Sequence, residues 1–195
     1  MPSNTPGLIL ASTSRYRKDL LSRLGLPFQI LPSNADEDAL DTETSADLAQ
    51  RLANAKAREV WTRHPESVVI GSDQVADMDG QRLGKPGTVE RAVEQLQSCS
   101  GKTVNFYTAV TVLAPDGKRH DHIDITGVSF RNLDLEEIRR YVETEKPLDC
   151  AGAFKAEALG ISLFRSISSQ DPTALTGLPL IWLSQCLREL GFQNP

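Results

Sequence analysis

An acidic residue and a lysine in one short segment have the spacing to act together. Residues 68–70 (VVI) are a β-branched run that predicts a buried strand, which we expect to end at Gly71-Ser72, just before Asp73. Asp79-Gly80 is a strong hairpin signal, and a hairpin there brings Lys85 back toward Asp73. The segment therefore predicts a carboxylate beside an ammonium group, facing a cleft. The alternative is that Asp73 caps the next turn and Lys85 is solvated.

A second candidate site lies near the N-terminus and has the composition of a phosphate pocket. Residues 7–11 (GLILA) predict a buried strand, and the hydroxyl residues Ser12 and Ser14 follow it. A helix with basic residues in its first turn, among them Arg17, then runs to Gly25. Cations are disfavoured at the positive end of a helix dipole, so these cations indicate a bound anion. The alternative is an ordinary Ser14 cap with a solvated basic turn.

An acidic loop and a helical lysine come between these two segments. Residues 36–38 (DED), which include Glu37, precede a helix that we expect over residues 45–63, capped by Thr44. Carboxylates beside phosphate-binding groups suggest Mg²⁺, which uses one or two protein oxygens together with substrate phosphates. Lys56 lies on the apolar side of the helix and could reach from the core edge into a cleft. The alternatives are a solvated loop and a surface lysine.

The rest of the chain alternates helices and strands. His120 and His122 are two residues apart on one predicted strand, but with no third ligand nearby we interpret them as structural. Glu157 is the polar outlier after a segment rich in small residues. The predicted elements are a helix over 88–96, strands over 103–113 and 122–130 joined by a turn at 115–117, a helix between Asp134 and Pro147, a strand over 161–167 and a final helix after 178–179.

Length and composition exclude several classes of protein. The 195 residues have no linker-like tract, so we expect one domain over residues 1–195. A formal net charge of −5 argues against nucleic-acid binding, which needs clustered lysine and arginine. Three cysteines without a C-x-x-C pair indicate reduced thiols in the cytoplasm. No apolar run approaches the roughly 18 residues of a membrane span, so no membrane partner is expected.

Taken together, these motifs resemble those of the Maf nucleoside triphosphate pyrophosphatases. The resemblance covers nearly the whole chain and rests on segments in the family's order and spacing: LILASTSRYRKDLLSRLG, the Asp36-Glu37 pair, Lys56, VVIGSDQVADMDGQRLGKP, SGKTVNFYTAVTVL, DCAGAFKAEALGISLF and TGLPL. It implies an α/β fold with a curved mixed sheet flanked by helices, and two lobes around a deep cleft. It also implies a divalent cation, Mg²⁺ or Mn²⁺, a homodimer, and hydrolysis of a nucleotide to its monophosphate and pyrophosphate.

The resemblance also assigns roles to the candidate residues. Asp73 matches the family's general base, and a set of polar residues matches its cleft: Ser12, Ser14, Arg17, Glu37, Lys56 and Lys85. Asp73 would activate water for attack on the α-phosphorus, while a metal held mainly by Glu37 would offset charge on the departing pyrophosphate. The basic residues would stabilise the polyphosphate.

Three departures from the commoner family pattern resemble the branch that acts on 7-methyl-GTP. Tyr16 replaces an arginine, Gln74 a threonine and Glu157 a glutamine. Because 7-methylguanine is a delocalised cation, Tyr16 can stack on it. Glu157 can accept from N1–H and the 2-amino group, and Gln74 can donate to O6. Arg15, where proline is frequent, is atypical of either branch and affects the shape of the first turn.

Two other interpretations of the function stay open. The first is a pyrophosphatase of the same family that acts on dTTP and UTP. The second is a non-catalytic division regulator or nucleotide-binding module, which the retained residues Asp73, Glu37, Lys56 and Lys85 argue against, because a pure binder needs no water-activating acid.

Overall fold

The computed structural model describes residues 6–40 and 42–193 and has a mixed α/β fold. The elements, in chain order, are β1 (Leu8–Leu10), α1 (Arg15–Ser22), β2 (Gln29–Ile30), α2 (Ser45–Arg63), β3 (Val68–Met78), β4 (Gln81–Leu83), α3 (Val89–Cys99), β5 (Thr103–Leu113), β6 (Arg119–Phe130), α4 (Leu135–Glu145), the 3₁₀ helices η1 (Ala151–Ala153) and η2 (Leu159–Leu163), β7 (Phe164–Ser168), η3 (Ala174–Thr176) and α5 (Leu180–Glu189).

The strands form one seven-stranded sheet in the order β2-β1-β3-β5-β6-β7, with β4 paired to β3. Contacts divide the chain into two units, so that β3, β5 and β6 each begin in one unit and end in the other. The first unit comprises the described residues within 1–74, 108–124 and 171–195, and the second comprises 75–107 and 125–170. The prediction of one domain over residues 1–195 stays a prediction, as does the cleft between two lobes.

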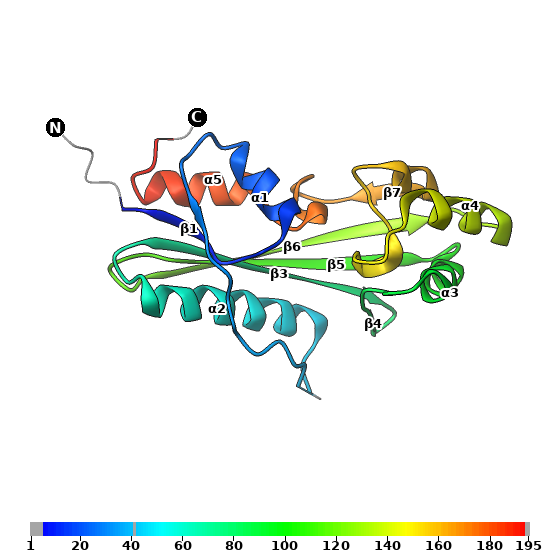
Figure 1. Cartoon of the computed structure of the whole chain (residues 1–195), viewed down its shortest axis with the longest axis horizontal. Coiled ribbons are helices and arrows are strands. Elements are labelled where there is room, and N and C mark those ends of the chain that lie inside the picture. The colour runs from blue at the N-terminus through cyan, green and yellow to red at the C-terminus, as the bar shows by residue number, and fades with distance from the viewer. Residues whose placement is uncertain (1–5, 41, 194–195) are drawn as a thin grey trace. The chain divides into compact units, whose positions relative to one another are not determined.

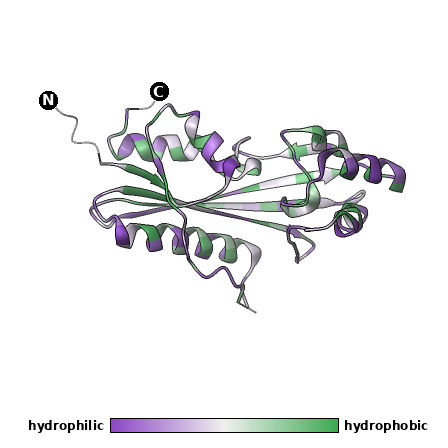
Figure 2. Ribbon diagram, in the orientation of Figure 1, coloured by the Kyte–Doolittle hydropathy of each residue, from purple (hydrophilic) through white to green (hydrophobic). Residues whose placement is uncertain are grey.

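The first unit has helices on both faces of its part of the sheet. Helices α1 and α5 lie on one face and α2 on the other (Figure 1). Strand alternation explains this arrangement, because successive side chains point to opposite faces. Leu8 and Leu10 join the cluster that includes Leu183 of α5, whereas Ile9 joins the cluster that includes Val60 of α2. The amphipathic pattern of the helices is visible as alternating hydrophobic and hydrophilic residues (Figure 2).

The second unit has an aromatic core. Four phenylalanines from three strands and one loop pack edge to face, with ring centroids 4.8 to 5.7 Å apart: Phe106, Phe130, Phe154 and Phe164. Edge-to-face pairs of this kind add to the free energy gained from burial alone. The core fixes the loop after α4, because Phe154 belongs to that loop.

Most of the sequence-based predictions of elements are confirmed. Helix α2 has the predicted bounds, and the Thr44 hydroxyl caps it by accepting from the Asp47 amide at 3.1 Å. Asp134 caps α4 in the same way, at 2.7 Å from the Glu137 amide. The Asp79-Gly80 hairpin also forms, with Met78 opposite Gln81. No helix in the described ranges is long and apolar enough to cross a membrane.

Two predictions about strands were wrong. Strand β3 does not end at Gly71-Ser72 but continues to Met78, so Asp73 lies within the strand. The predicted strand over 161–167 begins only at Phe164, and η2 occupies the residues before it. The reason is a tight turn: a Cβ on Gly160 would lie 2.4 Å from the Lys155 carbonyl oxygen, so the chain here is folded on itself.

Candidate active site

Asp73 lies in the part of strand β3 between its pairing with β1 and its pairing with β4. β3 pairs with β1 as far as Ile70 and with β4 from Ala76 onward; within the described residues, 71–75 pair with neither. The predicted strand end is therefore the end of the pairing with β1. Apart from the half-buried Gln74, residues 71–75 are buried. Asp73 points to one face of the sheet, and its neighbours Ser72 and Gln74 point to the other.

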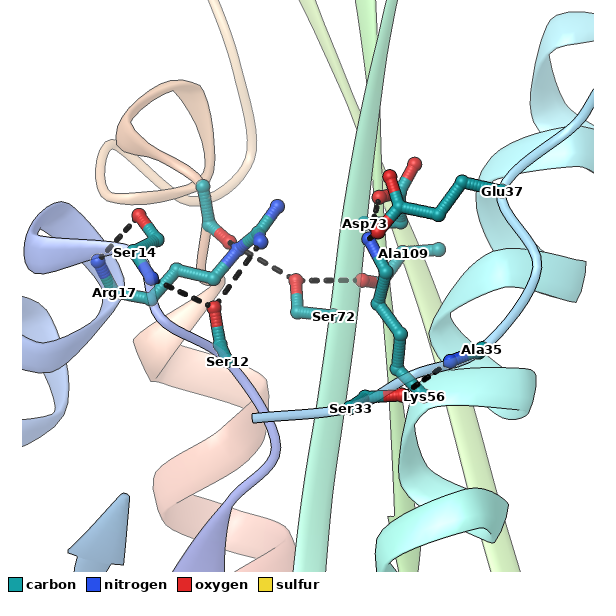
Figure 3. A network of polar contacts seen from close by, with 11 residues as sticks. Ser12, Ser14, Arg17, Ser33, Ala35, Glu37, Lys56, Ser72, Asp73 and Ala109 are labelled. Atoms are coloured by element: carbon teal, nitrogen blue, oxygen red, sulfur yellow. Dashed lines mark hydrogen bonds and ion pairs between the residues drawn. The ribbon is translucent and has the colours of Figure 1, made fainter. Parts of the chain in front are cut away.

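Lys56 links two carboxylates on the Asp73 face. Its Nζ lies 2.7 Å from Asp73 Oδ1 and 2.8 Å from Glu37 Oε1 (Figure 3). The side chains of Lys56 and Asp73 are only 10% and 11% exposed, whereas Glu37, on the loop before α2, is 62% exposed. A nearly buried ammonium needs such partners, because an unpaired charge in the interior is costly. The structure thus brings Glu37, Lys56 and Asp73 together, and their roles stay predictions.

The opening of α1 brings Ser12, Ser14 and Arg17 together. Ser12 Oγ accepts from the Ser14 amide at 3.1 Å, and Ser14 Oγ accepts from the Arg17 amide as the N-cap of the helix. The Arg17 guanidinium extends toward β3 and donates through Nε to the Gly177 carbonyl at 3.0 Å (Figure 3). Burial lowers the pKa of Arg17 from its ordinary value, and the nearby carboxylates of Asp73 and Glu37 act in the opposite direction. The guanidinium stays charged, as arginine does in proteins.

Sequence reasoning missed the polar groups that hold Gly177 in place. The buried hydroxyl of Ser72 lies within hydrogen-bonding distance of the carbonyls of Ala109 (2.8 Å) and Gly177 (3.0 Å), which share its one hydrogen. Next to it, Gln74 Nε2 donates to Thr108 Oγ1 and to the carbonyls of two residues in η3. The prediction that Gln74 donates to a guanine O6 stays a prediction, although its amide nitrogen already lies within hydrogen-bonding distance of three oxygens of the chain. The only sequence signal was the TGLPL segment that contains Gly177.

Tyr16 already engages a cation in this structure. The Arg15 guanidinium carbon lies 4.9 Å from the centroid of the Tyr16 ring, and Arg15 Nη2 donates to the Tyr16 hydroxyl at 3.4 Å. This geometry is a cation–π contact. It gives the atypical Arg15 a local role, and it shows that the ring is positioned to accept positive charge on one face.

Two predicted site residues, Lys85 and Glu157, belong to the second unit, so their approach to Asp73 stays a prediction. Both are exposed, and neither makes a hydrogen bond or ion pair within the described part of the chain. The loop that carries Glu157 is held against α4 on both sides of that residue. The Lys155 amide donates to the Tyr141 hydroxyl at 3.0 Å, and the Leu159 amide donates to Glu145 Oε1 at 3.1 Å.

The charges of the first-unit site balance. Lys56 and Arg17 offset Asp73 and Glu37, so a polyphosphate would bring uncompensated negative charge. Glu37 and Asp73 together offer the one or two carboxylates that Mg²⁺ takes from protein when phosphate oxygens complete its coordination. Among the described residues, no group of three or more histidine, cysteine or acidic side chains could hold a metal without such help. The residues present therefore fit a divalent cation that binds with its substrate.

Histidines and cysteines were the other candidate groups. His122 stacks on Trp182 with ring centroids 5.1 Å apart, and the structural interpretation of the histidine pair stays a prediction. Burial lowers the pKa of His122 from its ordinary value. The three cysteines are free; burial raises the pKa of Cys99 and of Cys186 to about 11, so neither is a nucleophile at neutral pH.

Comparisons with known proteins identify the family of this chain. A family model described as Maf-like protein matches residues 7–190. Two relatives named 7-methyl-GTP pyrophosphatase are similar over 97% of this chain: one from Xanthomonas campestris pv. campestris (55% identity, 99% of its length) and one from Pseudomonas aeruginosa (50% identity, 100% of its length). The solved structure of the Staphylococcus aureus Ham1 protein shares the fold, with a TM-score of 0.55 at 14% identity over 94% of this chain and 98% of that one. With a family match over almost its whole length and relatives at this level of identity, the chain belongs to the Maf family.

Proposed function

We propose that this protein hydrolyses 7-methyl-GTP to 7-methyl-GMP and pyrophosphate, which removes a modified nucleotide from the pool. The observation that carries the proposal is near full-length identity of 50 to 55% with relatives that bear this activity in their names. The arrangement of Glu37, Lys56 and Asp73 supports a hydrolase, because a carboxylate held by an ammonium group in a gap of the sheet is suited to activate water.

Asp73 is the proposed general base. Lys56 holds its Oδ1, whereas Oδ2 makes no hydrogen bond within the described part of the chain and can accept a proton from water. The oxygen of that water attacks the α-phosphorus, and the bond from this phosphorus to the bridging oxygen of the pyrophosphate breaks. The proton taken by Asp73 then leaves to solvent, which restores the carboxylate.

The cationic residues stabilise the charge that develops on the phosphates. Arg17 donates through Nε to the Gly177 carbonyl and through Nη1 to Ser12 Oγ at 3.5 Å, and its planar guanidinium group suits phosphate oxygens. Lys85 is proposed to complete the cation set. Glu37, together with phosphate oxygens of the substrate, would hold Mg²⁺ or Mn²⁺, which supplies Lewis-acid stabilisation of the leaving pyrophosphate when bound.

Recognition of the base is assigned to Tyr16 and Glu157. The Tyr16 ring would stack on the cationic 7-methylguanine, using the same π-system that contacts Arg15. Glu157 would accept from N1–H and the 2-amino group, and its charge would favour the methylated, cationic base. A uracil or thymine edge presents acceptors at O2 and O4 and would be disfavoured. The homodimer and the cytoplasmic location stay predictions.

A substrate panel tests the proposal. Purified protein is assayed with Mg²⁺ against 7-methyl-GTP, GTP, dTTP and UTP, with release of pyrophosphate as the readout. We expect the highest kcat/KM for 7-methyl-GTP. A preference for dTTP or UTP would favour the other branch of the family, and the absence of turnover with every nucleotide would favour the non-catalytic reading.

The base-recognition model is tested with Glu157→Gln. The ratio of kcat/KM for 7-methyl-GTP to that for GTP should fall about tenfold, because the variant loses the attraction between the carboxylate and the cationic base; a tenfold change corresponds to roughly 1.4 kcal/mol. Glu143→Gln is the matched control, because it removes one exposed negative charge in the same unit. An unchanged ratio in Glu157→Gln would refute the role of this side chain.

A further inference from the structure

The amide nitrogen of Gln74 faces a turn of the chain and lies within hydrogen-bonding distance of three oxygens, which share its two hydrogens. Its Nε2 lies 2.9 Å from Thr108 Oγ1, 3.1 Å from the Ala174 carbonyl and 3.0 Å from the Leu175 carbonyl. Thr108 in turn gives its hydroxyl hydrogen to the Ala174 carbonyl at 3.0 Å, so all three neighbours of Nε2 are acceptors. This pattern fixes the orientation of the amide, because its oxygen in the same place would face three acceptors.

The turn held by Gln74 also holds Arg17. Residues 174–177 close on themselves through the Gly177 amide, which donates to the Ala174 carbonyl at 2.8 Å. At the other end, the Gly177 carbonyl accepts from Arg17 Nε and from Ser72 Oγ, both at 3.0 Å. Gly177 has a φ of +114°, and a Cβ there would lie 3.4 Å from Arg17 Nε. A short covalent path therefore joins the acceptors of Gln74 to the acceptor of Arg17.

The side chains on the two faces of strand β3 contact different parts of the site around Asp73. Asp73 points to the face where Lys56 binds it, and the residues on either side of it, Ser72 and Gln74, point to the face that carries the turn. One strand thus sets the position of the carboxylate directly and the position of the Arg17 guanidinium through the turn. Neither Ser72 nor Gln74 needs to contact a substrate to act in this way.

We propose that Gln74 is a positioning residue for Arg17, acting through the turn 174–177, and not a reader of the base. This inference rests on the proposed function, in which Arg17 binds the polyphosphate. Loss of the Gln74 amide loosens the turn, displaces the Gly177 carbonyl and misaligns the guanidinium. The kcat/KM should fall by a similar factor for every nucleoside triphosphate, because the phosphates are common to all of them and the base is not.

The test compares Gln74→Met with the matched variant Gln50→Met. Gln50 is a glutamine of the same unit whose Nε2 also donates to chain oxygens, those of Thr111 and Asp121, but it has no link to the turn. We expect kcat/KM of Gln74→Met to fall about 10- to 100-fold for 7-methyl-GTP and GTP alike, in keeping with an ångström-scale misplacement. The ratio between the two substrates should change less than about twofold. Gln50→Met should keep the wild-type kinetics.

Inorganic tripolyphosphate, which has no base, provides a second readout. Its inhibition constant should rise in Gln74→Met, whereas a residue that only reads the base would leave it unchanged. Thr108→Val removes the other support of the Ala174 carbonyl without touching Gln74, and it should lower kcat/KM uniformly as well. Thr108→Val also tests the role of the turn if Gln74→Met does not fold.

A double-mutant cycle with Arg17 completes the test. In an Arg17→Lys background, Gln74→Met should have little further effect, because the group that it positions is already gone. A changed ratio of 7-methyl-GTP to GTP with unchanged tripolyphosphate inhibition would overturn the proposal in favour of base reading. If the wild type prefers another triphosphate, the proposed function fails, but the same cycle with that substrate, or tripolyphosphate binding by calorimetry, still tests Gln74.

Discussion

Replacement of Gly71 by alanine should separate the strand that carries Asp73 from the helix that carries Lys56. A Cβ on Gly71 would lie 2.3 Å from the Ala53 carbonyl oxygen and 2.5 Å from the Ala57 amide nitrogen, both backbone atoms of α2. The shorter contact is about 1.1 Å below the 3.4 Å at which ordinary contact begins. Because backbone atoms cannot rotate away, α2 and β3 must move apart by about this amount.

The shift has consequences for both stability and activity. Overpacking of this kind typically costs about 1 to 3 kcal/mol, which for a chain of this size lowers Tm by roughly 2 to 12 °C. The contact of Lys56 Nζ with Asp73 Oδ1, 2.7 Å in the native protein, would lengthen past hydrogen-bonding distance. A displacement of about 1 Å at a catalytic group can lower the rate about a hundredfold.

The assay is thermal unfolding together with kcat/KM for the preferred nucleotide. Gly7→Ala is the matched control, since a Cβ there makes only an ordinary contact of 3.4 Å with Ser67. A Gly71→Ala protein with Tm and kcat/KM like those of wild type would refute the reasoning. Full rescue by Ala57→Gly would also refute it, because that change removes the 2.8 Å contact with the Ala57 side chain but neither contact with the backbone.

Three further predictions follow from individual groups. Asp73→Asn should lower turnover at least about a hundredfold, because an amide cannot take the proton, while calorimetry still detects nucleotide binding; near-normal turnover would contradict the assignment of the base. At pH 8, Cys99 and Cys186 should react slowly with a disulfide reagent and Cys150, which is partly exposed, faster, because burial raises the pKa of the first two to about 11; three equal rates would contradict this. Because burial lowers the pKa of His122, the unfolded chain binds a proton more readily than the folded chain below pH 6.5, so stability should fall as the pH is lowered below that value. His122→Phe should lessen this fall in Tm, and a pH profile identical to that of wild type would contradict the prediction.

Side-chain chemistry of the site was predictable from the sequence, but the extent of strand β3 was not. Asp73 and Lys56 are charged residues among apolar neighbours, Glu37 belongs to an acidic loop, and the structure brings a carboxylate oxygen of Glu37 and one of Asp73 within 2.8 Å of Lys56 Nζ. The length of a strand depends on its partners. β3 continues past Ile70 because it still pairs with β5, which begins at Thr103, and no local pattern at Gly71-Ser72 reports a partner that far along the chain.

The part of the site that escaped prediction consists largely of backbone atoms. The Gly177 carbonyl holds Arg17 across 160 positions of sequence and Ser72 across 105, yet a carbonyl is the same in every residue and leaves no mark on the sequence. Gln74 shows the consequence. The sequence predicts that this polar side chain, next to the candidate base Asp73, contacts substrate, and the structure adds that its amide nitrogen faces carbonyls that only the folded chain brings near. Substitutions that separate activity from selectivity are therefore the sharper test of such residues, because a polar side chain near a site can act on the substrate or on the backbone that frames it.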